Sequence, residues 1–294
     1  MRRLEYIIGE KDSGKTLKQF LISSGYSREV RTLLKNTDGL SRGGERVIST
    51  DILHTGDIIK VCLGDEAPAD TVPNAALNAA VVYDDEDVVV FDKPAFMPVH
   101  QSMGHNNDTL ANYFAAFYPD TVFRAVYRLD RNTSGLVTVG KNKLCASLLM
   151  VNGYFSPKKT YFAVVEGDLK KKFGEKGRIT APIAREQESK IKRIVSEDGK
   201  YAETLFEVIK SGDSYSLVKI KLVTGRTHQI RVHFSYLGYP LYGDELYGGD
   251  TSFIRRQALH CGETEFIHPI TSEKLRFVSE LPQDMKALIK RLEN

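Results

Sequence analysis

One carboxylate in the chain, Asp130, stands where its charge could do chemistry. It lies in the stretch YRLDRNTSGL, residues 127–136, between Arg128 and Arg131 and directly before a Thr-Ser-Gly turn. A buried charge is costly unless it is paired, so an acid at the end of an apolar stretch belongs either to a structural ion pair or to a reaction. The local pattern alone favours a structural turn, because short polar side chains close backbone donors there.

A second polar cluster occupies residues 223–248, VTGRTHQIRVHFSYLGYPLYGDELYG, in which Gly225 predicts a turn from a strand into a helix. A metal site built on two of its histidines is disfavoured, because they are five residues apart rather than the four of a zinc-protease helix, and no acidic ligand follows the first. The polar side chains that follow Gly225 are too crowded to share one helix face, so several should face a ligand or partner: Arg226, His228, Gln229, Arg231 and His233.

Other reaction classes find little support in the sequence. Ser134 lacks the glycine two residues before it that a nucleophile elbow requires. There is no glycine-rich phosphate loop followed by Lys-Ser or Lys-Thr, and no Gly-x-Gly-x-x-Gly after a strand. The three cysteines, Cys62, Cys145 and Cys261, have no paired spacing, which indicates neither a zinc site nor a disulfide framework and fits a reducing cytoplasm.

Composition predicts an ordinary folded protein rather than a membrane or disordered one. Hydrophobic residues make up 41% of the 294 and charged residues 27%, and no window approaches the apolar length of a spanning helix. The net charge of +3 is uneven, because residues 1–60 hold 11 Lys or Arg against 8 Asp or Glu, while the remainder is balanced. This excess is a weak indication of a basic module that docks on nucleic acid.

The elements that must position these residues fall into two parts. Residues 14–36 have apolar side chains at helical spacing, predicting two short helices broken at Ser24–Gly25, with Ser27 capping the second. Turns and short strands follow, ending in the apolar run Ile58–Leu63. We therefore expect a small basic α/β domain over residues 1–64 and a linker over residues 65–77, where Pro, Asp, Asn and small residues show no core periodicity.

Residues 78–294 are expected to form one larger domain. Its first two strands surround the acidic turn Asp84–Asp87 as a hairpin, and the charged run at residues 170–177 reads as an exposed hairpin tip. Few helical patterns interrupt the strands, so we predict an α+β fold with a mixed, largely antiparallel central sheet. Further strands are predicted at Val122–Val126, Gly135–Gly140, Thr160–Val165, Thr204–Ile209 and Tyr215–Val223.

Several ordered motifs together resemble one known family. YRLDRNTSGL, then KKTYFAVVEG, then VTGRTHQIRVH with LGYPLYGD resemble the pseudouridine synthases of the RluA/RluD branch, which act on ribosomal and transfer RNA. The likeness runs over about residues 78–290 and implies the pseudouridine synthase fold. It also implies an isomerase that needs neither cofactor nor metal.

The resemblance assigns roles by motif position. Asp130 matches the catalytic aspartate, Tyr161 the aromatic that stacks on uracil and takes the proton from carbon 5, and Arg231 the arginine paired with the aspartate. Arg128 matches the arginine that contacts RNA beside the flipped base. Arg226 and His228 resemble further pocket or RNA contacts. Tyr127 departs from the family, which often has histidine there, and this puts only the local contacts of that side chain in doubt.

The implied reaction is consistent with one carboxylate. The bond from uracil nitrogen 1 to ribose carbon 1′ breaks, the ring turns, and carbon 5 joins carbon 1′, with no redox step. The carboxylate can attack the sugar carbon or ring carbon 6 as nucleophile, or remove the 2′ proton as base, and the sequence leaves these open. Desolvation raises the pKa of such a carboxyl, so a guanidinium such as that of Arg231 is expected beside it to keep it ionised.

The N-terminal part more faintly resembles the small RNA-binding domain first seen in small-subunit ribosomal protein four. The segment HTGDIIKV agrees best, whereas GKTLKQFL and DGLSRGGERVIS depart from the usual pattern. By this resemblance and the basic excess, Arg28, Arg31 and Lys35 are candidate RNA contacts.

The sequence therefore predicts a cytoplasmic, monomeric RNA-uridine isomerase whose partner is RNA and not a membrane. Large-subunit (23S) ribosomal RNA is the leading substrate, because the N-terminal domain is typical of the ribosomal members of this branch. Transfer RNA is the alternative substrate, and an RNA-binding ribosome-assembly factor without catalysis is the alternative function. A nucleoside hydrolase would need a second carboxylate, for which Asp244 is the nearest candidate.

Overall fold

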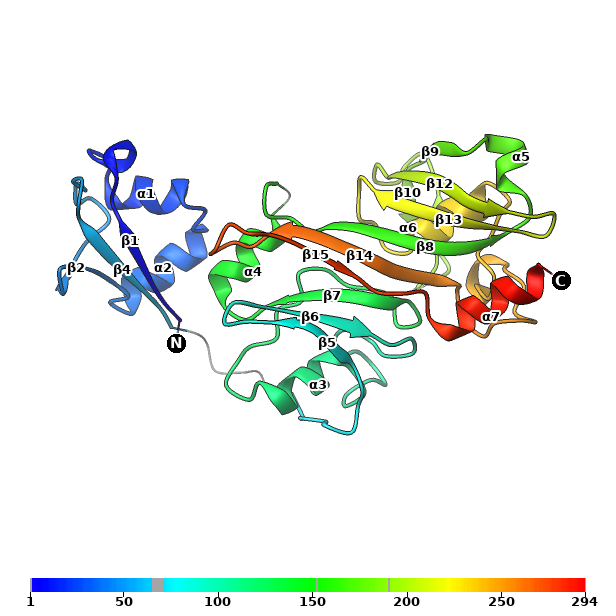
Figure 1. The fold of residues 1–294 in the computed structure, drawn as a ribbon, viewed down its shortest axis with the longest axis horizontal. Helices are drawn as coiled ribbons and strands as arrows, with labels where there is room; N and C mark the ends of the chain where they lie inside the picture. The colour runs from blue at the N-terminus through cyan, green and yellow to red at the C-terminus, as the bar shows by residue number, and fades with distance from the viewer. Residues whose placement is uncertain (1, 65–70, 152, 190, 294) are drawn as a thin grey trace.

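The computed structural model describes residues 2–64, 71–151, 153–189 and 191–293. Two sheets dominate it: a small one near the N-terminus and a long one that runs through the rest of the molecule (Figure 1). No helix within these described ranges is long and apolar enough to cross a membrane.

The N-terminal part has two helices on a four-stranded sheet, as the sequence predicts. Thr16 and Gln19 form a capping box at the first helix, and the Ser27 side chain accepts from the Val30 amide at the start of the second. Apolar side chains at helical spacing turn to the sheet and are buried. In chain order the elements are β1 (Arg2–Ile7), η1 (Glu10–Asp12), α1 (Leu17–Ser23), α2 (Arg28–Asn36), β2 (Leu40–Arg42), β3 (Glu45–Arg46) and β4 (Ile58–Leu63), with sheet order β1-β4-β2-β3.

The long sheet has nine strands and confirms the α+β class with a mixed, largely antiparallel sheet. Among its pairings in the described residues, β7 with β14 is parallel and the others are antiparallel. The order is β5 (Ala80–Asp84), β6 (Val88–Lys93), β7 (Ser134–Gly140), β14 (Leu259–Ile267), β8 (Lys158–Glu166), β13 (Tyr215–Leu222), β12 (Glu203–Ser211) and β9 (Lys176–Thr180), with β15 (Lys274–Val278) on β14.

Helices and a minor sheet cover this long sheet. The hairpin predicted around Asp84–Asp87 is present as β5 and β6, and all of β7 is buried. The remaining elements are α3 (Leu110–Phe117), α4 (Lys143–Met150), α5 (Leu169–Phe173), β10 (Ile183–Arg185), β11 (Arg193–Val195), α6 (Gln229–Tyr236), η2 (Glu245–Tyr247) and α7 (Gln283–Leu292).

Two local predictions are wrong. Val122–Val126 is not a strand: β6 and β14 already pair with β7, and this segment meets the remaining edge in one isolated bridge, Ala125 to Val139. The charged run at 170–177 is not a hairpin tip, because Asp168 caps the short helix α5, the side chain of Leu169 is buried, and Gly174 ends the helix at φ +79°.

The N-terminal part packs on the long sheet's covering helix. Leu144 of α4 belongs to the same buried cluster as the N-terminal helices, and Leu148 packs against that cluster. Arg2 adds a two-point ion pair to the buried carboxylate of Asp87, with Nε–Oδ1 2.9 Å and Nη2–Oδ2 3.0 Å. The division into residues 1–64, 65–77 and 78–294 stays a prediction, and residues 65–70 of the predicted linker lie outside the described residues.

Candidate active site

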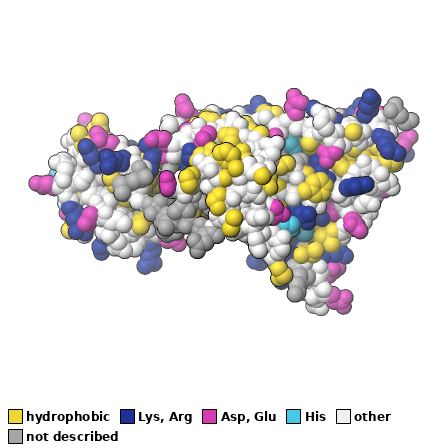
Figure 2. Space-filling view, turned by 90° about the horizontal axis from the view of Figure 1, so that it is seen from below, with side chains coloured by type: hydrophobic (Ala, Val, Ile, Leu, Met, Phe, Trp, Pro, Cys, Tyr) yellow, Lys and Arg dark blue, Asp and Glu magenta, His cyan; other side chains and the backbone are white. Residues whose placement is uncertain are grey.

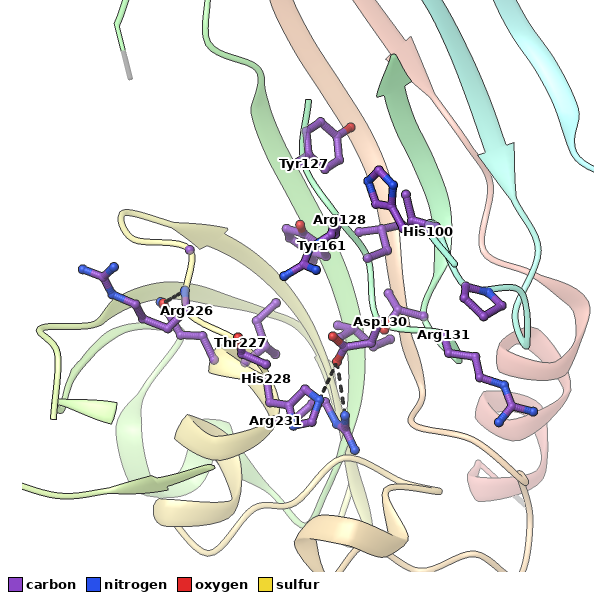
Figure 3. A pocket seen from close by; sticks show the side chains of 18 of the residues that line it. His100, Tyr127, Arg128, Asp130, Arg131, Tyr161, Arg226, Thr227, His228 and Arg231 are labelled. Atoms are coloured by element: carbon purple, nitrogen blue, oxygen red, sulfur yellow. Dashed lines mark hydrogen bonds and ion pairs between the residues drawn. The ribbon is translucent and has the colours of Figure 1, made fainter. Parts of the chain in front are cut away.

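A pocket of about 730 Å³ opens between the two halves of the long sheet. Its walls come from the loop after β6, the turn before β7, strand β8 and the turn from β13 into α6. Figure 3 shows these side chains converging on the pocket from both sides. The pocket brings together the six residues to which the resemblance assigns a role in it: Arg128, Asp130, Tyr161, Arg226, His228 and Arg231. Gln229 of the second polar cluster also lines it.

Asp130 sits in a turn that is tied down from several directions. The Thr133 amide donates to the Asp130 carbonyl at 3.0 Å, and Leu129 beside it is buried in the main core. Lys93, which is fully buried, donates from Nζ to the Arg131 carbonyl at 3.2 Å and to the Met97 carbonyl at 2.8 Å. Burial, then repulsion from Arg256, lowers the pKa of Lys93 to about 7. No local pattern around Lys93 predicts this contact.

Gly135 explains the Thr-Ser-Gly sequence after Asp130. Its φ is +112°, and a Cβ there would lie 2.3 Å from the Cys261 carbonyl oxygen on the parallel neighbour β14. Ser134 Oγ lies 2.9 Å from His260 Nδ1, which fixes the other side of the turn. A larger residue at position 135 would push β7 and β14 apart. The Thr-Ser-Gly sequence therefore holds the turn that carries Asp130 against the sheet.

Arg231 holds two carboxylates at once. Its Nη1 donates to Asp130 Oδ2 at 3.2 Å, while Nε and Nη2 each donate to Asp244 at 2.7 Å. The Arg231 side chain is 9% exposed, that of Asp244 1%, and that of Asp130 29%. Burial lowers the pKa of Arg231, but the bonds to Asp244 and Asp130 outweigh it and raise the pKa above its ordinary value. Asp130 is thus paired on one side and open to the pocket on the other.

Asp244 is a partner that sequence reasoning did not place. It was considered only as a second carboxylate for hydrolysis, yet both its oxygens accept hydrogen bonds from Arg231 in two-point geometry. Asp244 is also buried and is not among the residues that line the pocket, so it is not placed to protonate a leaving group there. The local pattern around Asp244 is a Gly-Asp pair in a turn, in which the Asp244 amide donates to the Leu241 carbonyl. That pattern indicates a turn but does not indicate the pairing with Arg231.

His228 leads into α6 with an unusual backbone. It has φ +58° and ψ +16°, in the left-handed region that residues other than glycine seldom adopt. This conformation places Nδ1 2.9 Å from the Tyr247 hydroxyl and Nε2 3.8 Å from Asp130 Oδ2 (Figure 3). Burial lowers the pKa of His228 despite the pull of Asp130, so the ring is neutral at neutral pH.

His233 does not join His228, so the metal pair considered from the sequence is absent. Its ring is buried, with Nδ1 2.9 Å from Thr204 Oγ1 and Nε2 2.9 Å from the Ala181 carbonyl. Within the described part of the chain, no group of three or more His, Cys, Asp or Glu side chains is placed to hold a metal ion.

Aromatic rings line the wall opposite Arg231. Tyr161 on β8 is 6% exposed, and burial raises the pKa of its hydroxyl well above the ordinary value, which keeps it protonated. Tyr127, at the position where the family often has histidine, donates from its hydroxyl to the Leu136 carbonyl at 3.1 Å. Lys159 lies over the Tyr127 ring, 4.2 Å from its centre. The substitution therefore changes a wall contact and leaves Asp130 in place.

Arginines stand at the mouth of the pocket. Arg128 is exposed and lies beside Tyr161 (Figure 3), and Arg226 is exposed with Nε donating to the Tyr201 carbonyl at 3.0 Å. Figure 2 shows Lys and Arg side chains on the N-terminal end and again farther along the same face, beside histidines.

The three basic residues predicted in the N-terminal part lie on α2 and do not line the pocket. Arg28 and Lys35 are exposed, whereas Arg31 is half-buried and donates to the Tyr26 carbonyl.

Comparisons with known proteins agree on one family. Residues 87–236 match the family model described as RNA pseudouridylate synthase. The chain is 40% identical over 283 residues to YjbO of Bacillus subtilis (strain 168), named an uncharacterized RNA pseudouridine synthase, covering 94% of this chain and 98% of that protein. It is 36% identical over 265 residues to ribosomal large subunit pseudouridine synthase D of Pseudomonas aeruginosa, covering 82% of this chain and 80% of that protein.

A solved structure gives the same answer. The human RNA pseudouridylate synthase domain containing 1 superposes with a TM-score of 0.57 at 25% identity, over 75% of this chain and 97% of the human one. With the matched family model and the close relatives, this confirms the resemblance drawn from the three motifs. The chain therefore belongs to the RNA pseudouridine synthases, in the RluA/RluD branch, and is an isomerase that converts uridine in RNA to pseudouridine.

Proposed function

We propose that this protein isomerises specific uridines of large-subunit ribosomal RNA, with Asp130 acting on a flipped-out uridine. The single observation that carries the proposal is the Asp130 carboxylate, paired to Arg231 at 3.2 Å and open to a 730 Å³ pocket beside the buried ring of Tyr161. The choice of ribosomal RNA rests on the relative from Pseudomonas aeruginosa, which is named for the ribosomal large subunit.

The side chains around Asp130 match the steps that the reaction requires. A uridine must leave its stack before its ribose–uracil bond can be reached, which costs a few kcal/mol. Tyr161 offers a ring on which the uracil stacks, and Arg128 at the pocket mouth fills the vacated place in the RNA. Arg231 donates a hydrogen bond to the Asp130 carboxylate and aims it at the ribose–uracil bond.

Proton transfer from uracil carbon 5 is assigned to Tyr161 with a condition. Because burial keeps its hydroxyl protonated, Tyr161 takes the proton from carbon 5 only as it gives its own proton to solvent water in the open pocket. His228 and Arg226, on the opposite side, contact the sugar and phosphates of the flipped nucleotide.

We propose that residues 1–64 form an RNA-binding domain that selects the substrate and works in the cytoplasm, where ribosomes are made. Arg28 and Lys35 are exposed on α2 and free to meet phosphates. Deleting the domain would expose Leu144 and Leu148 of α4, so the sharper test is the double variant Arg28→Gln, Lys35→Gln. Unchanged RNA affinity and unchanged site choice in that variant would refute the domain's role.

Two alternatives are weaker on this geometry. An assembly factor without catalysis has no need of a carboxylate that opens into a pocket lined by aromatic rings. A nucleoside hydrolase lacks its second acid, because Asp244 is taken up by Arg231.

The test is pseudouridine mapping of total RNA from cells with and without the gene. We expect at least one large-subunit ribosomal site to vanish in the deletion strain, to return with wild-type protein, and to stay absent with Asp130→Asn. Loss of transfer-RNA sites alone would move the substrate to transfer RNA. Persistence of every site would refute the assignment.

A further inference from the structure

A second cavity adjoins the active-site pocket. It has a volume of about 360 Å³ and lies between α3 and the segment that follows it, residues 118–123. His100 and Gln101, from the loop after β6, line both this cavity and the active-site pocket. The two spaces therefore share one wall, and Figure 3 shows His100 near Arg128 in the active-site pocket.

Four of the twelve residues that line the second cavity carry flat rings: His100, Phe114, Tyr118 and Phe123. Phe114 and Tyr118 are stacked with centroids 4.5 Å apart and an angle of 22° between their planes. Phe123 lies 5.3 Å from Phe114 and 5.2 Å from His100, in tilted and edge-on geometry. The exposed amide of Gln101 adds a polar group at the shared wall, with Nε2 donating to the Asn106 carbonyl at 2.7 Å.

This lining suits an unstacked nucleobase better than a phosphate. Single-stranded RNA is recognised by stacking splayed bases on aromatic side chains and by amides that meet their edges. The residues that line the cavity include no Lys or Arg, so its chemistry is that of a base site rather than a backbone site.

We propose that the second cavity binds the base of a nucleotide next to the target uridine on the same RNA strand. The inference rests on the proposed function, since it needs a uridine flipped into the neighbouring pocket. Extracting that uridine removes a stacking partner from the bases on both sides of it. A ring-lined cavity across one shared wall restores stacking to one of them and makes that position part of site selection.

A pocket-filling variant isolates this contact. Ala115 is half-buried on α3 and lines the second cavity, so Ala115→Phe places a ring where the base would lie without removing any aromatic contact. Ala116 is also half-buried on α3 but is not among the lining residues, so Ala116→Phe is the matched control. Neither residue lines the active-site pocket.

The experiment measures kcat/KM on ribosomal RNA fragments that contain the mapped uridine. Three fragments are compared: the intact one and two in which the neighbour on the 5′ or the 3′ side is abasic. For wild-type protein we expect one abasic fragment to lose about tenfold in kcat/KM, through KM, because stacking on one base is lost. Ala115→Phe should lose about tenfold on the intact fragment and nothing further on that abasic fragment. Ala116→Phe should match wild type.

Two results would overturn the inference alone. One is wild-type protein that treats all three fragments equally. The other is Ala115→Phe that acts as well as wild type on the intact fragment, which would leave the cavity to a different occupant such as a peptide or metabolite. If wild-type protein forms no pseudouridine in any RNA, the proposed function itself fails and the inference with it.

Discussion

Replacing Asp244 by asparagine tests whether the pairing of Arg231 with Asp244 and Asp130 sets the reaction rate as well as the stability of the fold. We call this pairing the arginine clamp. The carboxylate accepts two bonds of 2.7 Å from Arg231 and is almost fully buried. Removing one partner of such a pair costs about 3–5 kcal/mol, because a buried charge is left uncompensated. Asp130 still pairs with Arg231 at 3.2 Å, so we expect the lower end, about 3 kcal/mol of unfolding free energy.

The same change should slow the reaction. With Asp244 gone as anchor, the guanidinium of Arg231 shifts toward Asp130 and turns the carboxylate away from its working direction. A misplacement of about 1 Å costs on the order of 100-fold in rate. We therefore expect a single-turnover rate about 100-fold lower for Asp244→Asn, measured with enzyme in saturating excess over RNA.

Asp87→Asn is the matched control for this prediction. Asp87 is also a buried carboxylate held at two points by an arginine, Arg2, but it lies outside the pocket. It should lose similar stability in urea unfolding and keep the wild-type single-turnover rate, because saturating enzyme removes any effect on affinity. A wild-type rate in Asp244→Asn, or an equal slowing in Asp87→Asn, would refute the clamp.

Three further changes test other contacts of the fold and of the pocket. Gly135→Ala should cost about 3 kcal/mol in urea unfolding, because its Cβ would meet the Cys261 carbonyl at 2.3 Å and φ is +112°; a stable variant would contradict this. Burial lowers the pKa of His233 below its unfolded value of 6.5, so the unfolded state gains its proton before the folded state does as the pH falls through 6.5. Unfolding free energy should then drop by up to about 1.4 kcal/mol per pH unit below 6.5, less steeply in His233→Gln, and an equal slope in that variant would be contrary evidence. Tyr161→Phe should bind RNA normally but form pseudouridine at least about 100-fold more slowly, whereas Tyr161→Ala should also lose about tenfold in affinity by filter binding; full activity in Tyr161→Phe would exclude proton transfer by the hydroxyl.

Local signals in the sequence predicted most of the secondary structure, whereas the residues that meet in the pocket were predicted from the resemblance of ordered motifs to a known family. Ser27 capping and the hairpin at Asp84–Asp87 depend on neighbours in the chain, and both are present. The prediction of a strand at Val122–Val126 is wrong because a strand needs a neighbouring strand with a free edge. β7 already pairs with β6 on one edge and with β14 along part of the other.

The features missed in the site depend on contacts between distant segments. Lys93 donates a hydrogen bond to the carbonyl of Arg131, 38 residues later in the chain, and so holds the Asp130 turn. No pattern near Lys93 in the sequence predicts this contact. Asp244 lies 13 residues from Arg231, beyond one helix and one turn, so its pairing requires the fold. His228 has a left-handed backbone that no local pattern of glycine or asparagine predicts.

Release of hydrogen from uracil carbon 5 tests the central claim most directly. Each uridine converted gives up the hydrogen that carbon 1′ replaces, so RNA carrying tritium at carbon 5 reports the reaction itself. With a large-subunit ribosomal RNA transcript and excess enzyme, wild-type protein should release tritium from the mapped uridine. Asp130→Asn should bind the transcript with unchanged affinity and release tritium at least about 10⁴-fold more slowly than wild-type protein. Release by Asp130→Asn at the wild-type rate would contradict the account, because the reaction would then not depend on the carboxylate that Arg231 holds in the pocket.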